Sequence, residues 1–243
     1  MRDWKGKRYW LVGASEGLGR ALAYQLSRCG AEVIVSARSE ERLRDLADDL
    51  PGRASAIPVD ITNADSVSAA VDRAGPVDGL VTLAGTYWPM KTTEWNAERL
   101  QTMCDVNFTG TIRMLGAVVP GMIERGQGHV VVTGSLTALK GLPGALGYGA
   151  TKAGLVSFAE TMRADLQDTG VTVQVVNPGF IKTRLTDKND FKMPMLMEPE
   201  KAATEIFEHM NGDDFRKDFP GRLAAMLKGG RALPDWLFYK LVG

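Results

Sequence analysis

The chain has 243 residues, 44% of them hydrophobic, and α/β chains of this length commonly form one domain. The 29 Lys and Arg residues balance 29 Asp and Glu residues, so no overall charge would hold the protein on nucleic acid or an anionic bilayer. Cys29 and Cys104 lack metal-ligand spacing, no apolar signal region precedes Tyr9, and no apolar run approaches the roughly 20 residues of a membrane span. We therefore expect a cytoplasmic protein of one domain, 1–243, that acts on a small molecule, with no metal, no nucleic-acid partner and no integral membrane segment.

Short runs rich in β-branched residues alternate with longer amphipathic stretches, which is typical of parallel strands joined by crossover helices. The predicted strands are 9–12, 32–36, 54–59, 79–83, 129–133 and 171–176, with a seventh at 215–219. The predicted helices are 18–28, 40–50, 64–73, 97–125, 148–168 and 199–210. This alternation predicts an α/β fold: a single Rossmann-like doubly wound sheet of six or seven mainly parallel strands with helices on both faces.

Two segments depart from this alternation. Residues 182–197 hold three methionines among charged residues without a clean period, which indicates a mobile substrate loop. The tail 220–243 carries apolar residues at roughly helical spacing on a basic background. We expect the tail to pack as a lid or as a dimer contact, and peripheral membrane contact is the alternative.

The segment Gly13–Gly19, with the sequence GASEGLG, directly follows the first strand and opens the first helix. Such a turn needs positive φ and close backbone approach, and the helix N-terminus presents free N–H groups to a diphosphate. An ordinary strand-to-helix turn is the alternative. The residues expected to contact a dinucleotide here are Gly13, Ser15, Glu16, Gly17, Leu18 and Gly19.

The second strand ends at Ser36-Ala37-Arg38, where dinucleotide folds usually hold an acidic residue for the ribose hydroxyls. A guanidinium here can bind a 2′-phosphate that a carboxylate would repel. Arg38 therefore predicts NADP(H) in preference to NAD(H), and a solvated surface arginine is the alternative. Asp60 ends the third strand and could reach the adenine amine, although Asp-Ile-Thr-Asn is also a good helix N-cap sequence.

Tyr148 and Lys152 are four residues apart in a predicted helix, so their side chains share a face. An ammonium beside a phenol favours the phenolate, which would make Tyr148 a general acid and base at neutral pH. The same pair is common on solvated helix surfaces, so the surrounding residues must decide between the two interpretations.

Further polar residues follow the strands that should end at the same edge of the sheet. Ser135 lies beyond the strand at 129–133, and Asn177-Pro178-Gly179 closes the strand at 171–176, with Thr183 shortly after. Asn107 lies inside a predicted helix, where an amide side chain lowers helix propensity without a packing gain. Such a locally unfavourable choice indicates function.

Taken together, the Gly13–Gly19 loop, Asn107, Ser135, Tyr148-x-x-x-Lys152 and Pro178-Gly179 to Thr183 resemble the short-chain dehydrogenase/reductase family over roughly residues 8–185. The resemblance implies that Tyr148 exchanges the proton, Ser135 orients the carbonyl and Lys152 binds the nicotinamide ribose and lowers the tyrosine pKa. It also implies that the backbone of Asn107 helps to hold a water linking Lys152 to a proton relay. The cofactor would further contact Ala84, Gly85, Pro178, Gly179 and Thr183.

Three positions or segments differ from the family pattern. The usual Thr before the first glycine is Val12, and the usual Asn-Asn-Ala-Gly reads Thr82-Leu83-Ala84-Gly85. Thr82 can still form a hydrogen bond, whereas Leu83 cannot. The tail replaces the Gly-rich ending of tetrameric members, so the resemblance implies a homo-oligomer but leaves dimer or tetramer open.

The substrate side of this site is mostly apolar. The residues expected to border the substrate are Ser135, Leu136, Leu142, Pro143, Tyr148, Phe180, Trp88, Met193, Met195 and Met197. They favour a medium-sized apolar ketone, aldehyde or secondary alcohol, although several could simply fill the core. Two other functions remain open: a catalytically silent NADP(H) sensor or interaction protein, and a sugar-nucleotide epimerase, for which few residues remain beyond Thr183. His129 and His209 have no partner motif, and we expect no catalytic role for them.

Overall fold

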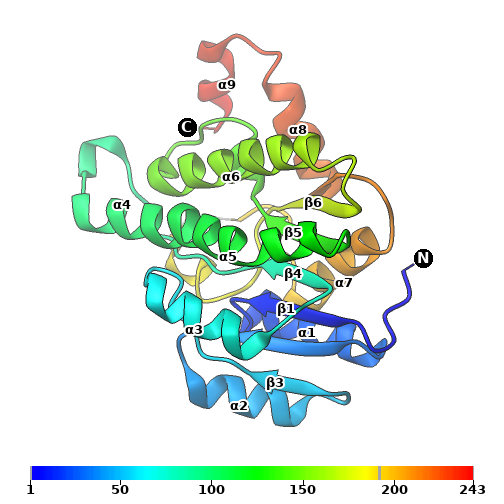
Figure 1. The fold of residues 1–243 in the computed structure, drawn as a ribbon. Coiled ribbons are helices and arrows are strands. Elements are labelled where there is room, and N and C mark those ends of the chain that lie inside the picture. Colours follow the sequence, from blue (N-terminus) through cyan, green and yellow to red (C-terminus); the bar gives the residue numbers. More distant parts are fainter. Residues whose placement is uncertain (1, 191–192, 243) are drawn as a thin grey trace.

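Seven strands form one sheet in the order β3-β2-β1-β4-β5-β6-β7, and every neighbouring pair is parallel (Figure 1). The computed structural model describes residues 2–190 and 193–242. Strands β1 and β4 are neighbours, so the strand order reverses between them, and doubly wound sheets bind ligands at such a point. The strands are β1 (Arg8–Val12), β2 (Glu32–Ser36), β3 (Ala54–Ala56), β4 (Gly79–Thr82), β5 (Gly128–Thr133), β6 (Val171–Pro178) and β7 (Arg216–Phe219).

Helices cover both faces of the sheet, which confirms the predicted fold class (Figure 1). Apolar side chains of α3, α5 and α6 pack on one face, and those of α1, α2 and α7 pack on the other. The buried strand residues alternate between these two clusters, as the period of a β-strand requires. The helices are α1 (Gly17–Arg28), α2 (Glu40–Asp49), α3 (Ala64–Ala74), α4 (Ala97–Met103), α5 (Thr111–Glu124), α6 (Leu146–Asp165) and α7 (Pro199–Met210).

Strand β3 is shorter than the predicted 54–59. It ends at Ala56, and Pro58 lacks the N–H that a longer ladder would need. The chain nevertheless stays beside β2, because Ile57 and Val59 donate backbone hydrogen bonds to Val35 and Ala37, both at 3.0 Å. The extended segment therefore still delivers Asp60 to the edge of the sheet.

The single helix predicted over 97–125 is wrong in detail. Residues Cys104–Gly110 form a π-helical segment, η2, between α4 and α5. A π-helical turn holds an extra residue and is found frequently at functional sites. Asn107 lies in this wider turn, which periodicity in the sequence does not reveal.

The tail forms two helices, α8 (Gly221–Gly230) and α9 (Asp235–Val242), which lie at the top of Figure 1, beyond the β6 side of the sheet. Leu223, Leu227 and Phe238 of the tail pack with Leu136 and Leu139, which follow β5. Lys140 also contacts α9, with its ammonium 3.0 Å from the Asp235 carboxylate and 4.4 Å from the centre of the Phe238 ring. The tail thus covers the segment that follows Ser135, a position that fits the lid expected from the sequence.

The two ends of the segment between β6 and α7 are joined by backbone contacts. Ile181 pairs with Met197, and the backbone N–H of Met197 donates to the carbonyl of Phe180 at 3.0 Å. A short 3-10 turn, η4 (Thr186–Lys188), lies between them. Residues 191 and 192 of the predicted substrate loop lie outside the described residues.

Within the described residues, one helical stretch, Ala97–Glu124, is long and apolar enough to cross a membrane by length and composition. From the sequence we expect no apolar run near the length of a membrane span. By the criterion of mean hydropathy that expectation is wrong, because this stretch meets it. In the structure, Met114, Leu115 and Met122 of this stretch are buried against the sheet. Its apolar character is that of a core helix, which passes the same test.

Candidate active site

The glycine loop folds tightly against the start of the segment that follows β4. Gly13 has φ +99°, and a Cβ there would collide with the backbone of Ala84. A Cβ on Gly19 would collide with the carbonyl oxygen of Gly13. Both positions therefore need glycine for close backbone approach, as the sequence predicts for a dinucleotide loop.

The N-terminus of α1 is open to a ligand. No side chain caps it, because the Glu16 side chain accepts no hydrogen bond from the first turn. Glu16 instead forms ion pairs with Arg184, which follows β6, and with Arg42 of α2 at 3.3 Å. Uncapped N–H groups at a helix N-terminus form a ready anion site, so this loop fits the diphosphate of a dinucleotide.

Arg38 is exposed just beyond β2, and its charge lies near Asp60. The pKa of Asp60 is lowered mainly by a hydrogen bond from the Thr62 hydroxyl at 2.7 Å, with smaller contributions from Arg38 and Arg113. The carboxylate therefore stays ionised beside the guanidinium. The structure brings together the two residues that the sequence assigns to the adenosine end of the cofactor.

The Asn107 side chain is fully buried and holds the segment after β4. Its Oδ1 accepts from the Thr86 backbone N–H at 2.7 Å, and its Nδ2 donates to the Thr86 carbonyl at 2.9 Å and the Thr151 hydroxyl at 3.3 Å. The Asn107 carbonyl accepts a hydrogen bond from the Thr111 hydroxyl at 2.8 Å. The amide thus ties η2 to the turn that contains Ala84 and Gly85, two expected cofactor contacts.

Tyr148, Ser135 and Lys152 converge where β5 ends and α6 begins. Tyr148 lies close enough to Ser135 for that side chain to act on the tyrosine pKa, and the Lys152 ammonium lies 5.7 Å from the centre of the Tyr148 ring. Lys152 is 3% exposed and donates to the carbonyl of Thr133 at 2.8 Å. The pair is therefore not a solvated one on a helix surface. It lies in a buried cluster whose geometry permits proton exchange.

Burial shifts both titrating groups of this cluster away from the charged form. It raises the pKa of Tyr148 to about 12, although the hydrogen bond with Ser135 acts in the opposite direction. It also lowers the pKa of Lys152 to about 8. The net shift of Tyr148 is therefore opposite to the lowering expected from the sequence: desolvation of the phenolate dominates, Tyr87 raises the pKa further, and Lys152 is not among the groups that shift it.

The end of β6 brings its predicted residues to the glycine loop. A Cβ on Gly17, where φ is +53°, would come within 2.9 Å of the Thr183 methyl group. The backbone N–H of Gly179 donates to the Phe219 carbonyl of β7 at 2.7 Å, which fixes Pro178-Gly179 at the same edge. Thr183 thus lies beside the loop that would hold the diphosphate.

The apolar residues expected around the substrate differ in their exposure. Leu136 and Met197 are 3% and 6% exposed and pack in core clusters, so the alternative that they fill the core is correct for these two. Leu142 and Phe180 are partly buried against the cluster that contains the tail. Met195 is exposed. The apolar wall is thus made by fewer residues than expected.

The sequence analysis missed two residues at the mouth of this cluster. The Tyr87 ring meets the Tyr148 ring edge to face, with centres 5.1 Å apart. Lys188 of η4 donates to the Tyr87 carbonyl at 2.7 Å, and its ammonium lies 4.4 Å from the centre of the Trp88 ring. Their placement depends on tertiary contacts. The only signal in the sequence is that Tyr87 lies two residues after Gly85.

The departure at Thr82-Leu83 from the family pattern is accommodated locally. Thr82 donates from its hydroxyl to the Val131 carbonyl at 3.4 Å, a long hydrogen bond between β4 and β5. Leu83 packs against the apolar cluster on the α1 face. The central sheet therefore keeps one side-chain link where the pattern has asparagines.

The fold is that of a dinucleotide-binding α/β protein, and the cluster lies at the carboxyl edge of its sheet. Residues 7–193 match the family model described as short chain dehydrogenase. The chain belongs to the short-chain dehydrogenase family, and it is of the oxidoreductase class.

Individual relatives agree with this assignment. A protein of Myxococcus xanthus named as an uncharacterized oxidoreductase is 37% identical over 235 residues, which is 94% of this chain and 93% of that protein. A 3-oxoacyl-[acyl-carrier-protein] reductase of Vibrio cholerae is 35% identical over 191 residues, 75% of this chain and 76% of that protein. Among solved structures, a short chain dehydrogenase from Burkholderia cenocepacia in complex with NADP superposes with TM-score 0.88 at 25% identity over 100% of both chains.

Proposed function

We propose that this protein transfers a hydride between NADP(H) and a carbonyl or secondary alcohol, with Tyr148 as the group that exchanges the proton. The observation that supports this most directly is the buried cluster at the end of β5. There Ser135 lies close enough to Tyr148 to act on its pKa, and Lys152 donates to the Thr133 carbonyl. An oxidoreductase of this family needs a proton donor beside a clamp for the carbonyl oxygen, and the cluster supplies both.

In the direction of reduction, Ser135 and Tyr148 orient the carbonyl oxygen by hydrogen bonds. NADPH, when bound, supplies the hydride that forms the new C–H bond. As that bond forms, Tyr148 donates its proton to the oxygen, and the product is an alcohol. A pKa of about 12 keeps the phenol protonated at neutral pH, so Tyr148 holds the proton that this step requires. Lys152, whose pKa is about 8, then carries the charge that stabilises the phenolate left behind.

The preference for NADP(H) over NAD(H) rests on the surroundings of Arg38. An exposed guanidinium at the end of β2 suits a 2′-phosphate, and Asp60 keeps negative charge next to it, towards the adenine side. The structurally similar dehydrogenase from Burkholderia cenocepacia is in complex with NADP, which supports a preference for NADP(H) here.

The proposed substrate is a medium-sized, mainly apolar carbonyl compound. The proposal takes Leu142 and Phe180 as residues that border the substrate; both are partly buried against apolar residues of the tail helices. A panel in which small charged carbonyls react better than apolar ones would overturn this part of the proposal.

The test compares the protein with its Tyr148→Phe variant, which keeps the aromatic ring and removes only the hydroxyl. Both are titrated with NADPH and NADH by fluorescence, and NADPH oxidation is then followed with ketones and aldehydes of graded size. We expect unchanged cofactor affinity and a loss of about 100-fold or more in kcat for the variant. Equal inactivity of both proteins, with cofactor still bound, would favour the silent cofactor-binding function.

A further inference from the structure

Ser135 is held through its backbone by a side chain of the neighbouring strand. The Ser135 N–H donates to Oδ1 of Asn177, in β6, at 3.0 Å. A Cβ on Gly134 would collide with this same oxygen, so the approach of the amide requires glycine next to Ser135. The position of the proposed oxygen clamp therefore depends on the orientation of one buried amide.

That amide is oriented in turn by a buried carboxylate. Nδ2 of Asn177 donates to Oδ1 of Asp218 at 2.7 Å, and the two residues are paired in the β6–β7 register. A carboxylate can only accept hydrogen bonds, so it fixes which end of the Asn177 amide faces Ser135. The Asp218 side chain is 3% exposed.

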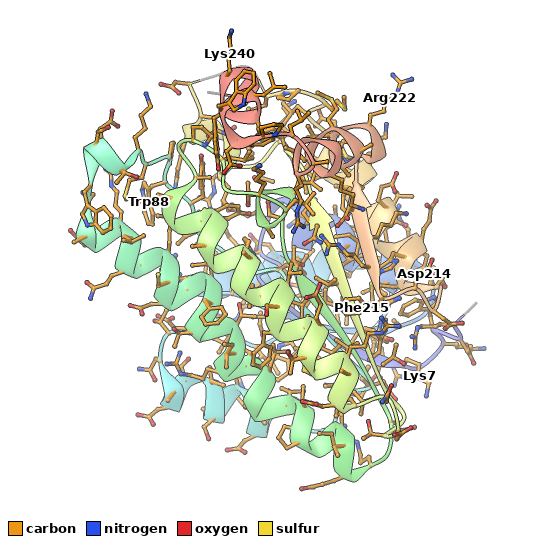
Figure 2. The ribbon with its side chains drawn as sticks, turned by 90° about the horizontal axis from the view of Figure 1, so that it is seen from above. Lys7, Trp88, Asp214, Phe215, Arg222 and Lys240 are labelled. Carbon is orange, nitrogen blue, oxygen red and sulfur yellow. The ribbon has the colours of Figure 1, made fainter. Side chains whose placement is uncertain are left out.

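Two cations hold Asp218 in its ionised form. Arg216 donates from Nε to Oδ1 at 2.9 Å, and Lys228 of α8 approaches Oδ2 to 2.6 Å. These partners and Asn177 lower the pKa of Asp218 although burial opposes them. Lys228 therefore turns towards β7, whereas Arg222 of the same helix points away from the molecule (Figure 2).

We propose that Asp218 is a positioning residue for Ser135, acting through Asn177, and that Lys228 makes helix α8 of the tail part of this arrangement. The proposal rests on the proposed function in so far as Ser135 is taken as the clamp for the carbonyl oxygen. Leu223 and Leu227 of α8 pack with Leu136, the residue after Ser135, so α8 supports the clamp by two independent routes.

The experiment uses the full chain with three substitutions. Lys228→Met removes one cation from Asp218 at a half-exposed position, and Lys228→Arg keeps the charge. Lys217→Met is the matched control, because Lys217 lies in β7 and pairs at 2.8 Å with Glu205 of α7, outside the chain of contacts to Ser135. Amide hydrogen exchange of the peptide that contains Ser135 is compared with kcat, KM and NADPH affinity.

For Lys228→Met we expect faster exchange in the Ser135 peptide and a loss of about tenfold in kcat, because a small displacement of a clamp lowers the rate steeply. NADPH affinity should stay within about twofold. Lys228→Arg should restore exchange and kcat, and Lys217→Met should change neither. If Lys228→Met matches the control in both exchange and kcat, the positioning role is overturned.

Asp218→Asn gives a second test that keeps the size of the side chain. It should weaken the hold on Asn177 more than Lys228→Met, with faster exchange at Ser135 while the melting curve remains cooperative. Slow exchange at Ser135 in a folded Asp218→Asn protein would contradict the proposal. If the unaltered protein binds NADPH but reduces no carbonyl, the proposed function fails, whereas the exchange measurements still decide the positioning of Ser135.

Discussion

Tyr148 shows how burial and charge compete at the scale of single residues. A lysine four residues away in a helix predicts a lowered tyrosine pKa, and the sequence analysis followed that rule. In the structure the Lys152 ammonium is directed to the Thr133 carbonyl, and desolvation raises the pKa of Tyr148 to about 12. The tyrosine is therefore held in its protonated form at neutral pH.

At the same scale, the cofactor preference is tested by Arg38→Asp. The substitution places a carboxylate where the 2′-phosphate should lie, so we expect NADPH affinity to fall by about 10- to 100-fold, the equivalent of one strong charge-assisted contact. NADH affinity should stay equal or improve. Arg44→Asp is the matched control, since Arg44 is an exposed residue of α2 that pairs with Glu40. Parallel losses in both variants would show that general surface charge, not Arg38, sets the affinity.

The part of the candidate site that could be predicted from sequence is the part whose residues belong to recognisable motifs. Tyr148, Ser135, Lys152 and Asn107 follow recognisable spacings, and the structure brings all four to one edge of the sheet. Tyr87 and Asp218 have no such spacing. They reach the site through the packing of η4 and through the register of β7 on β6, which only the tertiary structure defines.

At the scale of elements, the periodic patterns placed every strand and helix of the central fold, and they failed where the backbone departs from a regular period. The π-helical turn around Asn107 cannot be read from apolar spacing, because one extra residue leaves the flanking helix faces nearly unchanged. The early end of β3 follows from Pro58, a residue whose missing N–H is visible in the sequence.

The contact between the glycine loop and the segment after β6 leads to a prediction for Gly17→Ala. Alanine at φ +53° costs about 1 kcal/mol, and its Cβ would push against the Thr183 methyl group. We expect NADPH affinity to fall by about tenfold, measured by fluorescence titration, because both sides of the diphosphate site must shift. The control Gly221→Ala places its Cβ in open space at the start of α8. Unchanged affinity in Gly17→Ala would mean that Thr183 moves aside without effect on the site.

At the scale of the whole molecule, the opposite edge of the sheet contains a polar network that joins distant parts of the chain. The Tyr9 hydroxyl bonds to Nδ1 of His129 at 2.9 Å, and Nε2 of His129 bonds to Gln174 at 2.8 Å. Gln174 then donates to the carbonyls of His209, in the last turn of α7, and of Asp214, beyond that helix. The network connects β1, β5 and β6 to the end of α7 and the turn before β7, so His129 has a structural role.

Burial lowers the pKa of His129 to about 3, against an ordinary value of 6.5. Between about pH 3 and pH 6.5 this histidine binds a proton in the unfolded chain but not in the folded chain. The free energy of unfolding must therefore fall as the pH drops below 6.5. Above pH 6.5 this histidine leaves the free energy of unfolding unchanged. At pH 4.5 the loss from this histidine is about 2.7 kcal/mol. His129→Gln, which cannot titrate, should be less stable at pH 7 because it loses part of the network, yet should lose about 2.5 kcal/mol less than the unaltered protein between pH 7 and pH 4.5. Urea denaturation at the two pH values measures both effects. If both proteins lose the same free energy of unfolding between pH 7 and pH 4.5, the acid sensitivity of the fold comes from its carboxylates and not from His129.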